Sequence, residues 1–145
     1  MTSTIEDTLL HAMFLACHLN KCDLRYGVVA ILLELGLPAH RIGYQYIKEA
    51  ILLFYEEPTY LLMKGIYQAV GERIDPTAGE KQIEQAMRSV IDQAWRTRDS
   101  QVWKLYFPQD ERGRIKRPSN SEFVSRIACF LELWQGCYKE VSYEQ

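Results

Sequence analysis

The sequence lacks the patterns that mark membrane-spanning and secreted proteins. It has no apolar run near the roughly 20 residues that a membrane-spanning helix needs. Its N-terminus is acidic rather than basic and has no ending typical of a cleaved secretory signal. We therefore expect a cytoplasmic protein, in a compartment where thiols stay reduced.

Patterns for metal binding and catalysis are also missing. The four cysteines include no Cys-x-x-Cys pair, and the spacing of His11, Cys17, His18 and Cys22 fits no standard zinc site. The chain contains neither a glycine-rich phosphate loop nor a nucleophile elbow. We therefore expect free and mostly buried thiols, no metal or other cofactor, and no enzymatic activity.

An excess of positive charge is absent as well. The chain has 17 Lys and Arg residues against 19 Asp and Glu residues, and its net charge of −2 argues at first sight against binding nucleic acid. Residues 96–117 are an exception, because bases dominate there. The bases are Arg96, Arg98, Lys104, Arg112, Arg114, Lys116 and Arg117, and the acids are Asp99, Asp110 and Glu111. The part from 112 to 117 is either an ordinary surface loop or a source of phosphate contacts.

The residues that are present indicate helices. Hydrophobic residues make up 48% and charged residues 25% of the 145 residues, as in a soluble globular protein of one domain. Apolar residues recur at helical spacing, which predicts an all-α, compact domain of about six to seven helices. The expected helices cover residues 4–19, 24–35, 41–55, 60–74, 77–96, 100–107 and 119–134, with a loop at 109–118. Ser119 and Glu122 match a capping box at the start of the last helix.

The segment from Thr77 to Arg98 carries the strongest pattern. Thr77 and Glu80 match a capping box, and Pro76 discourages the preceding helix from continuing. One face is apolar: Ile83, Ala86, Met87, Val90, Ile91, Ala94 and Trp95. The opposite face carries side chains that can bond base edges in a major groove: Lys81, Gln82, Glu84, Gln85, Arg88, Ser89 and Asp92. Together with helix 60–74, this segment predicts a helix-turn-helix.

The chain is expected to divide into two parts. Residues 1–25 would form an N-terminal helical extension, and residues 26–145 would form a single globular unit. The apolar residues of the extension are Ile5, Leu9, Ala12, Met13 and Ala16. Because a fully exposed stripe of this kind is atypical of a soluble monomer, we expect it to pack on the globular unit or on a second chain.

Three groups of residues resemble one family. The first is Gly36-Leu37-Pro38-Ala39-His40, Gly43-Tyr44-Gln45-Tyr46 and Glu49-Ala50-Ile51; the second is Ile83-Glu84, Ala86, Arg88, Ile91 and Ala94-Trp95; the third is Pro118 with Asn120-Ser121-Glu122-Phe123. Over about residues 26–134, the chain is similar to the C-terminal DNA-binding effector domain of the stage-zero master regulator of sporulation in endospore-forming bacteria.

This resemblance implies both a function and its residues. The family's domain is all-helical, binds a short promoter box in double-stranded DNA and contacts the RNA polymerase sigma factor. The implied base-reading residues are Gln82, Glu84, Gln85, Arg88 and Ser89. Phosphate contacts are expected from Lys64, Lys81, Arg114, Lys116 and Arg117.

The chain departs from the family in three places. Residues 1–25 are too short for the family's phosphoacceptor receiver, so we expect no phosphorylation control. Gln82 and Gln85 stand where the family has arginines, and Ser89 stands where it has a histidine. Since arginine pairs with guanine and glutamine with adenine, we expect a different target box. The turn from Asp75 to Lys81 is also longer than the family's.

A second function stays open at this point. The fold could be retained while base reading is lost with the arginines, which would leave a protein-interaction or dimerisation module. The acidic balance of the chain favours this alternative, whereas Arg88 and the basic loop favour DNA. A homodimer is compatible with either function.

Overall fold

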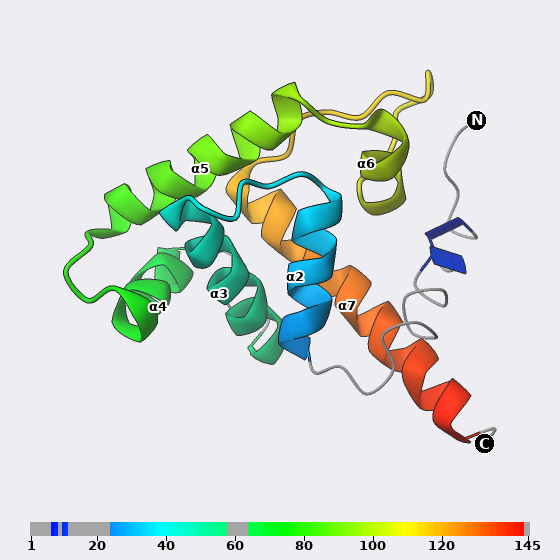
Figure 1. Ribbon diagram of the computed structural model, residues 1–145, viewed down its shortest axis with the longest axis horizontal. Helices are drawn as coiled ribbons and strands as arrows, with labels where there is room; N and C mark the ends of the chain where they lie inside the picture. The colour runs from blue at the N-terminus through cyan, green and yellow to red at the C-terminus, as the bar shows by residue number, and fades with distance from the viewer. Residues whose placement is uncertain (1–6, 9, 12–23, 58–63, 144–145) are drawn as a thin grey trace.

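The computed structural model describes residues 7–8, 10–11, 24–57 and 64–143 (Figure 1). Its helices in these ranges are α2 (Leu24–Glu34), α3 (Ile42–Glu56), α4 (Lys64–Ile74), α5 (Glu80–Arg96), α6 (Ser100–Tyr106) and α7 (Asn120–Tyr143). Over the described residues the structure has no β-strand beyond a single isolated bridge between Gln109 and Ile115. The predicted all-α fold is therefore confirmed.

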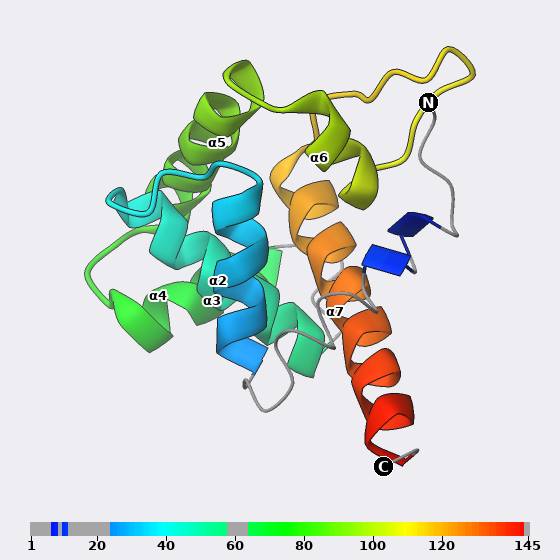
Figure 2. The ribbon, with the colours of Figure 1, turned by 45° about the vertical axis from the view of Figure 1, so that its right-hand side comes forward.

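Helix α3 is the centre of the fold. It packs against α2, α4, α5 and α7, and its buried residues lie on more than one side, including Tyr46, Ile47, Ala50 and Ile51. Helix α5 crosses one end of the group formed by α2, α3 and α7, while the second half of α7 extends away from the other helices (Figures 1 and 2). This arrangement leaves one long side of α5 at the surface.

Aromatic packing fixes the short helix α6 to the core. Trp103 is fully buried, and its indole N–H donates to the carbonyl oxygen of Leu35 at 3.1 Å. Its ring stacks on Phe107 with 5.2 Å between centroids, and Phe107 lies 5.5 Å from Phe123 of α7. The indole therefore buries a large apolar surface without leaving its polar atom unpaired.

A buried carboxylate joins three helices. Glu49 of α3 is only 5% exposed. Its carboxylate accepts hydrogen bonds from Arg25 of α2 at 2.9 Å and from Arg73 of α4 at 3.5 Å. Since a buried charge is costly unless it is paired, these two arginines explain how the Glu49-Ala50-Ile51 string can carry an acid in the core.

The two predicted capping boxes have different outcomes. At α7 the prediction is confirmed, because the Ser119 amide donates to Glu122 at 3.3 Å and the Glu122 amide donates to the Ser119 hydroxyl at 3.1 Å. At α5 the prediction is wrong, because the helix begins at Glu80 after Gly79, with no side-chain cap. The Thr77 hydroxyl donates instead to the Asp75 carboxylate at 2.8 Å.

The remaining boundaries differ from the expected ones by small amounts, except at the end of α7. Helix α2 ends as expected before Gly36, whose φ of 85° suits glycine. Helix α6 starts after Asp99, whose carboxylate accepts from the Gln101 amide at 3.0 Å. Helix α7 continues to Tyr143, beyond the expected end at residue 134. The expected start of helix 60–74 and most of helix 4–19 lie outside the described residues.

Two of the described residues near the N-terminus, Thr8 and His11, contact helices α6 and α7. The Thr8 hydroxyl donates to the Leu105 carbonyl oxygen at 3.1 Å. The His11 ring lies edge-on to Tyr106 of α6, with 5.7 Å between centroids, and 5.9 Å from Phe130 of α7. The residues of the extension's expected apolar stripe, from Ile5 to Ala16, are outside the described residues.

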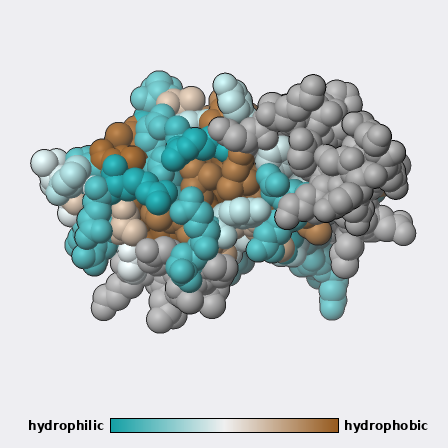
Figure 3. Space-filling view, turned by 90° about the horizontal axis from the view of Figure 1, so that it is seen from below, coloured by the Kyte–Doolittle hydropathy of each residue, from teal (hydrophilic) through white to brown (hydrophobic). Residues whose placement is uncertain are grey.

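Some large apolar side chains are exposed on helices other than α5. They include Tyr26 and Leu33 of α2 and Leu133 of α7. The end of the molecule opposite α5 shows hydrophobic surface between hydrophilic side chains (Figure 3). No helix in the described part of the chain is both long and apolar enough to cross a membrane.

Candidate nucleic-acid interface

Helices α4 and α5 form the predicted helix-turn-helix. A Cβ atom on Gly71 of α4 would lie 3.2 Å from the Ile83 side chain and 3.6 Å from the Ala78 carbonyl oxygen, so the two helices approach closely there. Val70 and Ile83 are fully buried near this contact. The absence of a side chain at Gly71 thus allows the tight packing of the pair.

The turn between these helices is fixed from α3. The Tyr46 hydroxyl donates to the Asp75 carboxylate at 2.7 Å, and the Ala78 amide donates to the Asp75 carbonyl oxygen at 3.1 Å. Burial, reinforced by the bond to Asp75, raises the pKa of Tyr46 to about 12. Hydrogen bonds from Tyr46 and Thr77 lower the pKa of Asp75, which therefore stays ionised at neutral pH.

The buried and polar faces of α5 are those predicted from the sequence. Its buried residues are Ile83, Met87, Val90, Ile91 and Ala94, while Ala86 and Trp95 are half-buried. Of the predicted base-reading residues, Gln82, Gln85 and Arg88 are exposed, and Glu84 and Ser89 are half-buried at the edges of the polar face. All five therefore lie on one helix, and three of them are exposed.

The side of α5 toward α3 contains a residue that the sequence did not indicate. Arg41, directly before α3, donates to the Ser89 hydroxyl and to the Gln93 side-chain oxygen, both at 2.7 Å. The contact joins positions more than forty residues apart in the chain, about 48 for Arg41 and Ser89. Local periodicity carries no signal for such a pairing.

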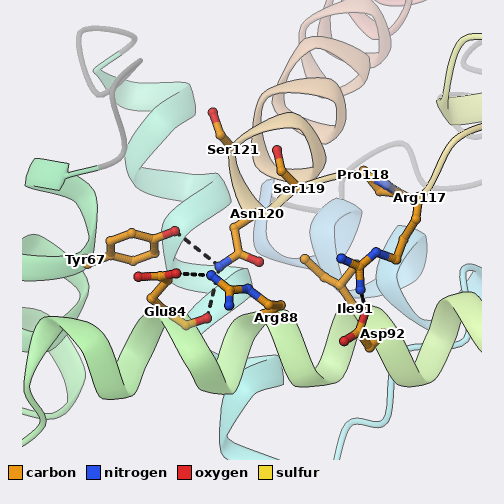
Figure 4. A pocket seen from close by; sticks show the side chains of 10 residues that line it. All are labelled: Tyr67, Glu84, Arg88, Ile91, Asp92, Arg117, Pro118, Ser119, Asn120 and Ser121. Carbon is orange, nitrogen blue, oxygen red and sulfur yellow. Dashed lines mark hydrogen bonds and ion pairs between the residues drawn. The ribbon is translucent and has the colours of Figure 1, made fainter.

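The side of α5 toward α7 forms a pocket of about 260 Å³ (Figure 4). It is lined by Tyr67, Glu84, Arg88, Ile91, Asp92, Arg117, Pro118, Ser119, Asn120 and Ser121. Arg88 forms an ion pair with Glu84 one turn before it, and Arg117 forms an ion pair with Asp92. Each of these two cations is therefore matched by a carboxylate of α5.

Asn120 anchors α7 to the helix-turn-helix at this pocket. Its amide nitrogen donates to the Tyr67 hydroxyl of α4 at 3.2 Å and to the Glu84 carbonyl oxygen of α5 at 3.0 Å. Burial raises the pKa of Tyr67, and its bond to Asn120 partly offsets this. The Asn120 side-chain oxygen is buried and has no hydrogen-bond partner within the described residues. It remains an acceptor available to a donor that enters the pocket.

The predicted phosphate-binding residues do not form one cluster. Lys81 is exposed in the first turn of α5, and Arg117 lies beside Asp92. Arg114 and Lys116 line a separate hollow in the loop after α6, where Arg114 lies 3.5 Å from Asp110. Lys64 begins α4, and its side chain lies outside the described part.

Metal ligation finds no support in the described residues. They contain no group of three or more His, Cys, Asp and Glu side chains arranged to hold a metal ion. Among the four residues considered from the sequence, Cys17, His18 and Cys22 lie outside the described ranges. His11 instead contacts Glu34 and Tyr106.

Comparison with known protein families identifies the family of this chain. Residues 28–131 fit the model of the family described as "Sporulation initiation factor Spo0A C terminal". The matched range begins in α2 and ends in α7, so it includes the helix-turn-helix and both sides of α5.

Proposed function

The chain belongs to the Spo0A C-terminal family, and from this premise we propose that it is a transcription regulator that binds double-stranded DNA sequence-specifically through α5. The observation that carries the proposal is the exposed polar row Gln82, Gln85 and Arg88 on the second helix of a helix-turn-helix. In that motif the second helix enters the major groove. The proposal places the protein in the cytoplasm with its DNA target.

The residue types suggest how bases are read. Glutamine bonds the N6 and N7 edge of adenine with both of its polar atoms, so Gln82 and Gln85 favour adenine over guanine. Arg88 can bond the O6 and N7 edge of guanine, and Glu84 can accept from the amino group of cytosine. Ser89 contributes at the edge of the face, where its hydroxyl is already bonded by Arg41.

Arg88 must leave Glu84 to reach a base. The pair joins residues one helical turn apart, and the Arg88 side chain is 55% exposed. Exposed pairs at this spacing stabilise a helix by only about 0.3–0.5 kcal/mol, whereas a bidentate base contact is worth about 1–3 kcal/mol. The exchange from Glu84 to guanine is therefore favourable.

Phosphate contacts would supply most of the affinity that is independent of sequence. Lys81 and Arg117 have the best positions, because both lie beside the polar face of α5. Lys64, Arg114 and Lys116 complete the proposed set from α4 and from the loop before α7. As in the family, the RNA polymerase sigma factor is a proposed protein partner, and a homodimer is a further proposal.

Selection of bound sites from a random duplex library tests the function directly. We expect an enriched motif that contains adenine at the positions read by Gln82 and Gln85. Titration of the selected duplex over a range of salt concentrations should give a steep loss of affinity with salt. No enrichment, together with binding that does not respond to salt, would contradict the proposal.

The alternative function is a protein-interaction module. It is favoured by the two ion pairs Glu84–Arg88 and Asp92–Arg117, which neutralise cations beside α5, and by exposed Tyr26 and Leu33. It predicts weak, salt-insensitive contact with duplex DNA and a change in solution mass when a partner or a second copy binds. The same salt titration therefore separates the two functions.

A further inference from the structure

We propose that Arg41 is a DNA-binding residue, which contacts a backbone phosphate on the side of α5 that faces α3. The inference rests on the proposed function and extends it, because no pattern in α5 or in the basic loop includes this residue. Three observations support it: the position of Arg41 before its own helix, the close approach of α3 to α5, and the charge of its surroundings.

The first observation is that the side chain of Arg41 does not cap the helix that it precedes. It occupies the N-cap position of α3 with extended backbone angles (φ −93°, ψ 147°), and no side-chain bond caps the helix. Serine, threonine, aspartate and asparagine are preferred there because they accept bonds from the first amides. An arginine has no acceptor, so its side chain is free to extend to another element.

The second observation is the contact between α3 and α5. A Cβ atom on Gly43 would lie 2.2 Å from the Ala86 carbonyl oxygen and 2.6 Å from the Val90 side chain. Only glycine permits this approach. The start of α3 is thereby placed against α5, and the half-buried Arg41 reaches the Ser89 hydroxyl and the Gln93 side-chain oxygen, both at 2.7 Å.

The third observation concerns charge. Both partners of Arg41 are neutral, and within the described residues it forms no ion pair, whereas Arg88 and Arg117 are each paired with a carboxylate. A guanidinium carries five N–H donors, and the two bonds to α5 leave the others available. The positive charge of Arg41 is therefore not cancelled at short range and can meet a phosphate.

The placement of Arg41 matches the shape of a DNA groove. Ser89 and Gln93 lie on the side of α5 toward α3, and Asp92, which holds Arg117, lies on the side toward α7. A helix in a major groove has one phosphate strand on each side. Arg41 and Arg117 thus contact two sides of α5, where a duplex bound to this helix would bring its two backbones.

The test compares single-arginine variants of the full chain on a generic duplex, over a range of salt concentrations. Arg41→Ala should make the decrease of log K with log salt less steep by about 0.9. If the variant and the unaltered chain bound equally at 1 M salt, the variant would then bind about eightfold more weakly at 0.1 M salt. The loss should be equal on selected and random sequences. Arg126→Ala is the matched control, because Arg126 is exposed and its guanidinium donates to the Tyr106 carbonyl oxygen rather than to α5.

Two further variants separate charge from a purely structural role. Arg41→Lys keeps the cation and should keep the salt dependence of the unaltered chain. Arg41→Gln keeps donors for Ser89 and Gln93 but should show the same reduced salt dependence as Arg41→Ala. Thermal melting checks that all variants fold. If Arg41→Ala or Arg41→Gln showed the same salt dependence of binding as the unaltered chain, the role of Arg41 would be overturned and the proposed function would stand. Binding by the unaltered chain that ignores salt would overturn both.

Discussion

At the scale of single residues, the polar face of α5 holds its side chains in different states before any DNA is bound. Gln82 and Gln85 are exposed, Arg88 is held by Glu84, and Ser89 is held by Arg41. The two glutamines can therefore meet bases without breaking a bond, whereas Arg88 exchanges one partner for another. Specificity should depend first on the glutamines.

Exchange of these glutamines for the family's arginines should change which box is bound. Because two guanine contacts are missing, we expect the unaltered chain to bind the family's sporulation box poorly. Gln82→Arg with Gln85→Arg should improve binding by more than about a hundredfold, since each contact is worth about 1–3 kcal/mol. Titration at one fixed salt concentration measures this. Tight binding by the unaltered chain with no gain in the double variant would show that neither residue reads a base.

Arg88 gives a complementary prediction. Arg88→Ala should weaken binding to the selected duplex by about 1–3 kcal/mol and relax the preference at one base pair, while binding to random duplex changes less. Arg126→Ala serves as a control, because its guanidinium donates to the Tyr106 carbonyl oxygen, away from α5. Equal losses on selected and random duplexes would assign Arg88 to the phosphate backbone.

At the scale of helices, two short sequences of the same type end in different structures. Ser119-x-x-Glu122 and Thr77-x-x-Glu80 both match a capping box, yet only the first caps a helix. The difference lies in Asp75, which Tyr46 of α3 holds in place and which takes the Thr77 hydroxyl. A tertiary contact thus decides where α5 begins.

Removal of the Ser119 hydroxyl should therefore destabilise the fold more than removal of the Thr77 hydroxyl. Ser119→Ala loses a cap and should lower the free energy of unfolding by about 1 kcal/mol. Thr77→Ala loses only an exposed bond to Asp75 and should cost less than about 0.5 kcal/mol. Denaturant unfolding of both variants measures the costs. Equal costs would mean that Thr77 contributes to the start of α5 after all.

The close contact between α3 and α5 gives a second prediction at this scale. Gly43→Ala places a Cβ atom 2.2 Å from a backbone oxygen that cannot move aside, so we expect a loss of about 1–3 kcal/mol or more. Gly79→Ala is the matched control, because nothing lies within 4 Å of the added atom. Thermal unfolding should separate the two by several degrees. Similar melting temperatures would contradict the close approach that positions Arg41.

These cases show what periodicity predicts and what it leaves out. The apolar stripe of α5 and the order of helices follow from local spacing, because burying one face of a helix needs residues three and four apart. Contacts of Arg41 with Ser89 and of Arg117 with Asp92 join separate elements, and they depend on how the helices pack. The exposed polar face of α5 and the basic loop that contains Arg117 could therefore be predicted from the sequence, whereas the contacts of Arg41 and Arg117 with α5 could not.

At the scale of the whole molecule, one polar cluster joins the N-terminal segment to the effector fold. The His11 ring nitrogen lies 3.0 Å from the Tyr106 hydroxyl and 3.3 Å from a carboxylate oxygen of Glu34, to which Tyr106 donates at 2.6 Å. The cluster therefore connects three parts of the chain: the N-terminal segment, α2 and α6. Burial and the bond to Glu34 raise the pKa of Tyr106, so its hydroxyl remains a donor.

The same cluster should make stability depend on pH. Burial alone would raise the pKa of Glu34, but hydrogen bonds from His11 and Tyr106 outweigh it, so the pKa lies below the ordinary value of 4.5. Folding then favours the ionised form. The contribution of Glu34 is fully present above that ordinary value and is lost as the pH falls through the lower pKa of the folded state. Glu34→Gln should therefore reduce the melting temperature clearly at pH 7 and much less in the acid range.

Thermal melting between pH 7 and about pH 3 checks this dependence. Glu111→Gln is the control, since Glu111 is exposed in the loop after α6 and should show a small difference at every pH. In the His11→Ala background, the pH-dependent part of the Glu34→Gln effect should shrink, because one of the two donors that lower the pKa is gone. A Glu34→Gln effect that stays constant over the whole range would mean that this carboxylate is not stabilised by the N-terminal segment. Such a result would show that the N-terminal segment is not linked electrostatically to α2 through Glu34.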